Sequence, residues 1–436
     1  MKRLSILLSL LLLLPTAIFA QQAYEPTPEN LQSRREFADM RFGIFIHWGL
    51  YSMFAQGEWY MQNAGIPYAE YSKAASAFYP ANFDAAQWVS AIKASGAGYV
   101  TFTSRHHEGF SMWHTSQSTY NIVDATPFKR DILRELADEC HRQGLRLHLY
   151  YSHLDWARED YPMGRTGRRC GKDPARADWP AYYQFMNAQL TELLTNYGEI
   201  GAIWFDGWWD HDSDTSPFDW QLPEQYALIH RLQPACLIGN NHHFAPNPGE
   251  DIQIFERDLP GENSAGFVDQ AAQISRLPLE TCQTMNGMWG YKVIDQNYKS
   301  TKEIIHYLVN TAGKGANLLL NIGPQPNGEL PATALDRLRE IGEWFNVYGS
   351  TIRATQAGDI PVQPWGATTR RDNHLFVHIL NYDSREIFLP LDCKVLSANI
   401  FADSTPVKVT STDTGVLITL PTVPTAIDTV IDLLTD

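Results

Sequence analysis

Eight short apolar segments recur between residues 42 and 323, and they constrain the fold of this chain more than any other feature. Many are separated by stretches with the spacing of amphipathic helices, such as residues 84–96 and 129–144. Buried strands that alternate with such helices predict a parallel sheet covered by helices. The segments are FGIFIHWG (42–49), YVTFTSRHH (99–107), LRLHLYYS (145–152), IGAIWFDG (200–207), CLIGNN (236–241), IQIFERD (252–258), LETCQT (279–284) and NLLLNIGP (317–324).

Eight strands over about 280 residues favour a (β/α)8 barrel. A doubly wound open sheet is the alternative, but no glycine-rich phosphate loop follows the first strand. Beyond about residue 351 the helical spacing disappears, and apolar and polar residues alternate between turn residues. This change predicts a C-terminal antiparallel β-sandwich. We therefore expect a catalytic barrel over residues 21–350 and a sandwich over residues 351–436.

The N-terminus has the features of a secretory signal peptide. Lys2 and Arg3 precede an apolar run that ends in the small residue Ala20. Pro15 and the shortness of the run argue against a membrane anchor. We expect residues 1–20 to be removed and the protein to be exported, to the periplasm or the extracellular space, with no membrane insertion after cleavage.

The formal net charge of −15 disfavours nucleic acid as a partner. The five cysteines form no CxxC pair, and no HxH or HExxH spacing is present, so the sequence predicts neither a metal site nor a cofactor. It predicts no particular oligomeric state.

Polar side chains gather where the predicted strands end. Active sites of barrels of this kind form at the C-terminal ends of the strands, so these residues predict one lined pocket. In chain order they are His47, His106, His107, Tyr150, Asp206 and Glu256.

Each of these residues also has a plainer interpretation. Asp206 could cap the turn that follows it, as aspartate often does before glycine. His47 could be a core histidine with its hydrogen bonds satisfied. His106 and His107 could form a metal pair, but adjacent residues diverge as they leave a strand and chelate poorly. Neutral imidazoles that hydrogen-bond hydroxyl groups are the better account of this pair.

A pocket with carboxylates, histidines and tryptophans, and with no cofactor loop, favours glycoside hydrolysis. That reaction needs one carboxyl group to attack or to activate water, and a second to protonate the leaving oxygen. Asp206 is the candidate for the first role. Glu58 and Trp59, in GEWY, place a carboxylate beside an indole, as in sugar-binding sites. Candidates for the second role are Glu256, Glu262 and Glu280, with the shorter Asp258 also possible.

Six segments of this chain, in this order, resemble the signature stretches of the α-L-fucosidases of glycoside hydrolase family 29. They are FGIFIHWGLYS, GEWY, HHEGFSMW, YYSHLDW, WFDG and NLLLNIGP. The resemblance spans roughly residues 35–350. It implies a retaining exo-hydrolase that removes terminal α-L-fucose from fucosylated glycans, with Asp206 as the nucleophile. It implies that Trp289, in MWGY, packs against the methyl group of fucose. The full set of substrate-binding residues that it implies is His47, Glu58, Trp59, His106, His107, Tyr150, Trp204 and Trp289.

The resemblance favours Glu256 as the acid/base, followed by Glu262 and Glu280. The mechanism predicts a raised pKa for this residue, so that it holds a proton near neutral pH. Some family members carry an arginine after the fifth strand, where this chain reads NNHHF. Candidates to replace that arginine are Asn240, Asn241, His242 and Arg257. We expect leaving-group specificity in loops such as 158–178 and 209–222.

Two other functions remain open from the sequence. One is a retaining hydrolase of a related sugar such as α-L-galactose, which has the configuration of fucose but carries a 6-hydroxyl group. The apolar wall near Trp289 discriminates between these two sugars. The other is a non-catalytic carbohydrate-binding protein on the same fold, which would need neither Asp206 nor a second acid.

Overall fold

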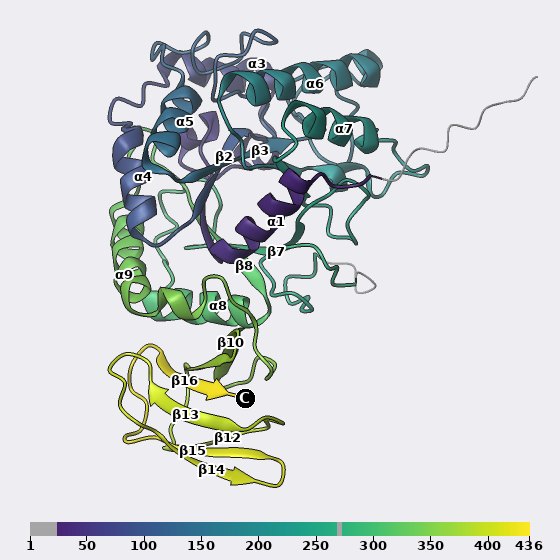
Figure 1. The fold of residues 1–436 in the computed structure, drawn as a ribbon. Coiled ribbons are helices and arrows are strands. Elements are labelled where there is room, and N and C mark those ends of the chain that lie inside the picture. The colour runs from purple at the N-terminus through teal and green to yellow at the C-terminus, as the bar shows by residue number, and fades with distance from the viewer. Residues whose placement is uncertain (1–23, 268–272) are drawn as a thin grey trace, which may run out of the picture.

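The computed structural model describes residues 24–267 and 273–436, so the predicted signal peptide lies outside the described residues (Figure 1). Eight parallel strands form one sheet in the order β5-β4-β3-β2-β1-β8-β7-β6. A bridge between Gly239 and Ile252 joins β5 to β6 and brings the sheet close to a closed barrel. All eight predicted strands are confirmed. They are β1 (Phe42–Ile46), β2 (Tyr99–Arg105), β3 (Arg146–Ser152), β4 (Ala202–Asp206), β5 (Leu237–Asn240), β6 (Gln253–Glu256), β7 (Leu279–Thr284) and β8 (Ala316–Ile322).

The longer helices lie around the outside of the barrel (Figure 1). Local signals set their ends. For example, the Asp131 side chain caps the first turn of α5, and Gly144 ends that helix in the left-handed conformation, with φ of 71°. The connection from β5 to β6, residues 241–252, contains no helix. The helices of the barrel are α4 (Ala85–Ala94), α5 (Ile132–Gln143), α6 (Trp179–Asn196), α7 (Leu222–Leu232), α8 (Thr301–Gly313) and α9 (Ala332–Tyr348).

An N-terminal helix, α1 (Pro28–Met40), closes the barrel at the end where the strands begin (Figure 1). Phe37 of this helix is fully buried and its ring lies 5.2 Å from that of Tyr99, the first residue of β2. The Asn317 side chain, near the start of β8, donates to the Phe37 carbonyl at 2.7 Å. The opposite end of the barrel, where the strands finish, stays open for the site.

The C-terminal residues form two antiparallel sheets, as predicted, and they lie beyond α8 (Figure 1). One has the order β13-β16-β11-β10-β9 and the other β12-β15-β14. Buried aliphatic residues such as Val377 and Ile418 make up their common core. The strands are β9 (Gln356–Ala357), β10 (Gly366–Arg371), β11 (His374–Ile379), β12 (Glu386–Leu389), β13 (Val395–Ile400), β14 (Lys408–Thr412), β15 (Gly415–Thr419) and β16 (Thr429–Thr435).

Candidate active site

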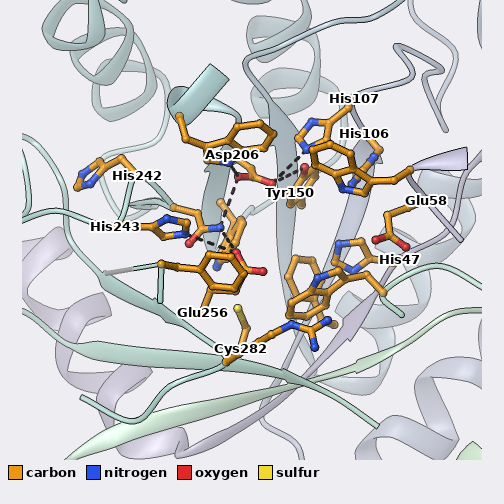
Figure 2. A pocket seen from close by; sticks show the side chains of 18 of the residues that line it. His47, Glu58, His106, His107, Tyr150, Asp206, His242, His243, Glu256 and Cys282 are labelled. Atoms are coloured by element: carbon orange, nitrogen blue, oxygen red, sulfur yellow. Dashed lines mark hydrogen bonds and ion pairs between the residues drawn. The ribbon is translucent and has the colours of Figure 1, made fainter. Parts of the chain in front are cut away.

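A cavity of about 700 Å³ opens at the C-terminal ends of the barrel strands (Figure 2). The favoured catalytic pair and every residue expected to bind the substrate line it, although these residues come from segments far apart in the chain. The structure thus brings together His47, Glu58, Trp59, His106, His107, Tyr150, Trp204, Asp206, Glu256 and Trp289.

Asp206, the last residue of β4, is surrounded by hydrogen-bond donors. Its Oδ2 accepts from the Tyr150 hydroxyl at 2.9 Å, and its Oδ1 accepts from the Trp209 indole N–H at 2.9 Å. The Gly207 N–H donates to Oδ1 at 2.8 Å, from a left-handed backbone conformation with φ of 95° that favours glycine. These donors favour the ionised form of a buried carboxyl group. Asp206 is therefore suited to be a nucleophile rather than only a turn cap.

Glu256, the last residue of β6, faces Asp206 across the cavity floor (Figure 2). The Asn241 side-chain nitrogen lies 2.8 Å from Glu256 Oε2 and 3.4 Å from Asp206 Oδ1. These two distances together limit the two oxygens to a separation of at most 6.2 Å. His243 Nε2 lies 3.5 Å from Glu256 Oε2. The site therefore contains two carboxyl groups close enough to act on one bond.

The surroundings shift the pKa values of the two carboxyl groups in opposite directions. Burial, and then the charge of Glu256, raise the pKa of Asp206, while hydrogen bonds from Trp209 and Tyr150 oppose that rise. Burial also disfavours the charged form of Glu256, but contacts with His243 and Asn241 outweigh it, and the pKa of Glu256 lies below its ordinary value. The raised pKa expected at the acid is therefore wrong for Glu256, because contacts with His243 and Asn241 stabilise its carboxylate.

The other candidate acids lie outside the cavity lining. Glu262 is on the surface, 3.3 Å from Lys314 Nζ. Asp258 accepts backbone N–H groups from a neighbouring loop. Glu280 is fully buried and accepts from the Tyr99 hydroxyl at 2.6 Å and the Trp204 indole at 2.8 Å, and burial raises its pKa to about 7. Of the four carboxylic acids considered, only Glu256 reaches the cavity.

The hydrogen-bond network assigns the tautomers of two histidines. Ser152 Oγ donates to the Leu154 carbonyl, so it accepts from His107 Nδ1 at 2.7 Å. Asn321 donates to the Trp289 carbonyl through its nitrogen, so its oxygen accepts from His47 Nδ1 at 2.6 Å. In both rings Nε2 is left as an acceptor.

Burial keeps these rings neutral. It lowers the pKa of His47 to about 3 and that of His107 well below its usual range. Within the cavity, His107 Nε2 lies 3.5 Å from Asp206 Oδ2, so two acceptors face the same space. A hydroxyl group that donates into this space would satisfy both acceptors, whereas treating the two histidines as ordinary core residues leaves their Nε2 atoms without a donor.

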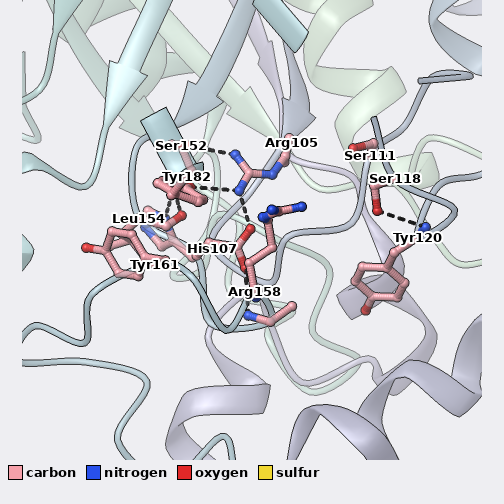
Figure 3. A network of polar contacts seen from close by, with 12 residues as sticks. Arg105, His107, Ser111, Ser118, Tyr120, Ser152, Leu154, Arg158, Tyr161 and Tyr182 are labelled. Atoms are coloured by element: carbon pink, nitrogen blue, oxygen red, sulfur yellow. Dashed lines mark hydrogen bonds and ion pairs between the residues drawn. The ribbon is translucent and has the colours of Figure 1, made fainter. Parts of the chain in front are cut away.

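A buried ion pair supports the loop behind His107 (Figure 3). Arg105 and Asp155 are both fully buried and are hydrogen-bonded to each other. Arg105 also donates to the Ser152 carbonyl at 3.1 Å and to the Tyr182 hydroxyl at 2.8 Å. Because Ser152 accepts the hydrogen bond from His107 Nδ1, the Arg105–Asp155 pair helps to fix the orientation of the His107 imidazole.

His106 stacks on Tyr150, with ring centroids 5.4 Å apart. Within residues 24–267 and 273–436, no group of three or more histidine, cysteine or acidic side chains is placed to hold a metal ion. His106 and His107 both line the cavity.

Residues 11–350 match the family described as alpha-L-fucosidase. This chain belongs to the alpha-L-fucosidase family. It is 32% identical to the plasma alpha-L-fucosidase of Rattus norvegicus, over 80% of this chain and 78% of the rat protein.

Solved structures of the family share this fold. Alpha-L-fucosidase isoenzyme 1 from Paenibacillus thiaminolyticus is 34% identical, with a TM-score of 0.84, over 94% of this chain and all of that one. A GH29 alpha-L-fucosidase from Bacteroides thetaiotaomicron is 25% identical, with a TM-score of 0.80, over 95% of this chain and 98% of that one. Its structure holds a covalent intermediate, trapped with 2-fluoro-fucosyl fluoride in a variant that has glutamine in place of a glutamate.

The walls of the cavity in this fucosidase-family chain combine flat apolar faces with polar edges. Trp59 stacks on Trp209, with ring centroids 5.6 Å apart. Glu58 is buried, and it accepts the Gly290 N–H at 2.7 Å. Trp289 lies beside Phe45, with centroids 6.0 Å apart. Phe45 was not singled out from the sequence, although its position two residues before His47 in a strand puts both on one face.

The loop residues of the site have no strand periodicity in the sequence that would place them in the cavity. Of the candidates for the position of the family's arginine, Asn241, His242 and Arg257 line the cavity, whereas Asn240 does not. His243 also lines it, from a left-handed backbone conformation with φ of 69°.

Both loops expected to set leaving-group specificity contribute to the cavity lining, with Arg165 from the first and Trp209 and Asp212 from the second. Arg165 and Asp212 lie there 3.2 Å apart. Phe244 and Phe267 line the same cavity and are about two-fifths exposed. The outer part of the cavity is therefore built from both loops and from two aromatic faces.

Proposed function

We propose that this protein is an exo-acting, retaining α-L-fucosidase with Asp206 as nucleophile and Glu256 as acid/base. The observation that carries the proposal is the Asn241 amide, which limits the two carboxylate oxygens to at most 6.2 Å. Inverting enzymes hold their carboxyl groups roughly 6.5–9.5 Å apart to admit a water, and retaining enzymes roughly 5–5.5 Å. The trapped covalent intermediate of the Bacteroides relative supports the same chemistry.

The reaction then has two balanced steps. In the first, an Asp206 oxygen forms a bond to the anomeric carbon, the bond to the leaving oxygen breaks, and the proton of Glu256 goes to that oxygen. In the second, Glu256 takes a proton from water, and the water oxygen displaces Asp206. His47 and His107 accept hydrogen bonds from the sugar hydroxyls through their free Nε2 atoms.

Glu256 must hold a proton when the substrate is bound. Contacts with His243 and Asn241 oppose this by favouring the carboxylate. His243 Nε2 lies 3.5 Å from Glu256 Oε2. We infer that a bound sugar excludes water from Glu256 and so favours its protonated form, because burial disfavours the charged carboxylate.

Hydrolysis of 4-nitrophenyl α-L-fucoside followed by proton NMR tests the proposal. We expect α-L-fucose as the first anomer, because two displacements at the anomeric carbon retain its configuration. The β anomer appearing first would contradict the assignment of Asp206 as nucleophile. An absence of hydrolysis, with fucose still bound in calorimetry, would favour the non-catalytic carbohydrate-binding alternative.

Fucose is preferred over α-L-galactose because Phe45, Cys282 and Trp289 give the cavity an apolar wall. We expect kcat/KM for 4-nitrophenyl α-L-fucoside to exceed that for the α-L-galactoside by roughly 10- to 100-fold, since an apolar pocket rejects an added hydroxyl only moderately. Side-by-side rates measure this ratio, and 4-nitrophenyl β-D-galactoside is the control for general galactosidase activity. Equal rates for the two L-sugars would show that the wall does not select the methyl group.

The leaving group is the remainder of a fucosylated oligosaccharide or glycoconjugate. Arg165 and Asp212 offer donors and acceptors to its hydroxyl groups, and Phe244 and Phe267 offer aromatic faces. Such mixed polar and aromatic surfaces suit sugar rings, which have both apolar faces and polar edges.

Residues 1–20 act as a signal peptide and the mature protein works in the periplasm or the extracellular space, with residues 21–350 as the catalytic domain and 351–436 as the sandwich. The basic residues before the apolar run and the small residue at its end support export. In the part of the chain that the structure describes, no helix is long and apolar enough to cross a bilayer.

A further inference from the structure

The position of Asn241 follows from the order of the barrel strands. β5 is the neighbour of β4, which ends in Asp206, and the bridge to Ile252 places it beside β6, which ends in Glu256. Asn241 is the first residue after β5, and its N–H donates to the Phe205 carbonyl at 2.9 Å. The residue is therefore level with Asp206, and its side-chain nitrogen contacts both carboxylates.

The amide group of Asn241 contacts both carboxylates with one atom. Nδ2 lies 2.8 Å from Glu256 Oε2 and 3.4 Å from Asp206 Oδ1. An amide nitrogen carries two hydrogens, so it can donate one to each carboxylate. Asn241 is only 2% exposed, so water cannot easily replace these contacts.

The negative charge of the site changes place during the proposed reaction. Asp206 begins charged and becomes a neutral ester, while Glu256 gives up its proton and becomes charged. The second step reverses both changes. The net charge of the pair stays at one unit, and the Asn241 amide lies between its two locations.

We propose that Asn241 is a catalytic residue whose amide stabilises the negative charge alternately on Glu256 and on Asp206. The inference rests on the proposed function and adds a role that neither carboxylate supplies. The shorter contact is to Glu256, so the main effect falls on the step in which Glu256 loses its proton. A cationic side chain in this place would favour ionisation of both carboxylates at once, whereas a neutral amide donates hydrogen bonds without adding charge.

The test compares Asn241→Ala on two substrates that differ in their need for the acid. Phenyl α-L-fucoside has a poor leaving group and requires the proton of Glu256, whereas the fluoride of α-L-fucosyl fluoride leaves with little help. We expect kcat/KM to fall about 100-fold or more with the phenyl fucoside, the usual effect of removing a donor from developing negative charge. With the fluoride we expect a loss of about tenfold or less.

Two further variants make the result interpretable. Asn240→Ala is the matched control, because Asn240 is a buried amide one residue earlier that donates to the Tyr226 hydroxyl at 2.8 Å. We expect its two rates to change in equal proportion. Asn241→Asp keeps the shape but replaces the donor with a third carboxylate, so its loss with the phenyl fucoside should exceed that of Asn241→Ala. If thermal unfolding shows that Asn241→Ala does not fold, Asn241→Asp replaces it in the comparison of the two substrates.

An equal loss on both substrates would reduce Asn241 to a structural role and overturn the inference, as would rates near those of the wild type. Wild-type protein that hydrolyses neither substrate would instead contradict the proposed function itself. These outcomes are distinguishable within one set of measurements.

Discussion

Asp206→Ala is expected to lower kcat for 4-nitrophenyl α-L-fucoside by about 10⁴-fold or more. The substitution removes the atom that bonds to the anomeric carbon, and no other residue supplies a nucleophile in its place. Nitrophenol is a good leaving group, so the loss reports on the nucleophile rather than on the acid. Nitrophenol release by wild type and variant, measured side by side, gives the ratio. Added azide should partly restore turnover in the variant and yield β-L-fucosyl azide, because azide enters the vacated space and inverts the anomeric carbon once.

A covalent label checks the same assignment independently of rate. We expect 2-fluoro-fucosyl fluoride to add one fluorofucosyl group to the wild-type protein, on the peptide that contains Asp206, and none to Asp206→Ala. Asp210→Asn is the matched control, since Asp210 is a buried acid four residues further on that lies outside the cavity lining. The control should still take the label. Turnover that survives in Asp206→Ala would contradict the mechanism.

The barrel could be predicted because its signal is local and repeated. Most of the barrel strands contain an apolar run, including the four-residue β5 and β6, whereas β7 (LETCQT) mixes apolar and polar residues. The sandwich strands were harder to predict individually. β14 reads KVTST and has mostly exposed side chains, so it lacks the alternation of exposed and buried residues that β12 shows. A polar edge strand depends on its partner, and no pattern in its own sequence defines it.

The strand-end residues of the site could be predicted for the same reason as the barrel, because parallel strands point their last side chains into one pocket. Asn241 was only one of several candidates, since its role depends on which strands flank β5. His243 and Arg165 come from loops, where neither periodicity nor spacing gives a signal. The direction of the Glu256 pKa could not be read from the sequence either, because it depends on how the chain folds His243 back against β6.

Glu256→Ala is expected to lower kcat/KM for phenyl α-L-fucoside by about 10²- to 10⁴-fold, the range that general acid catalysis contributes. The loss with α-L-fucosyl fluoride should be much smaller for the first step, because fluoride needs little protonation. With the fluoride as substrate, azide should restore turnover and yield α-L-fucosyl azide, since it attacks the fucosyl-enzyme in the second step without a general base. The opposite azide anomers of Asp206→Ala and Glu256→Ala distinguish nucleophile from acid/base.

The pH dependence provides the second readout for Glu256. An acid is active while protonated, so in the wild type kcat/KM for the phenyl fucoside should fall as pH rises through the pKa of Glu256. His243 and Asn241 lower that pKa, which moves the fall toward lower pH. Glu256→Ala should lack this alkaline limb. Glu262→Ala, which removes the surface candidate beside Lys314, is the matched control and should keep both the limb and the rate. A limb that persists in Glu256→Ala, or azide rescue in Glu262→Ala instead, would move the acid/base role away from Glu256.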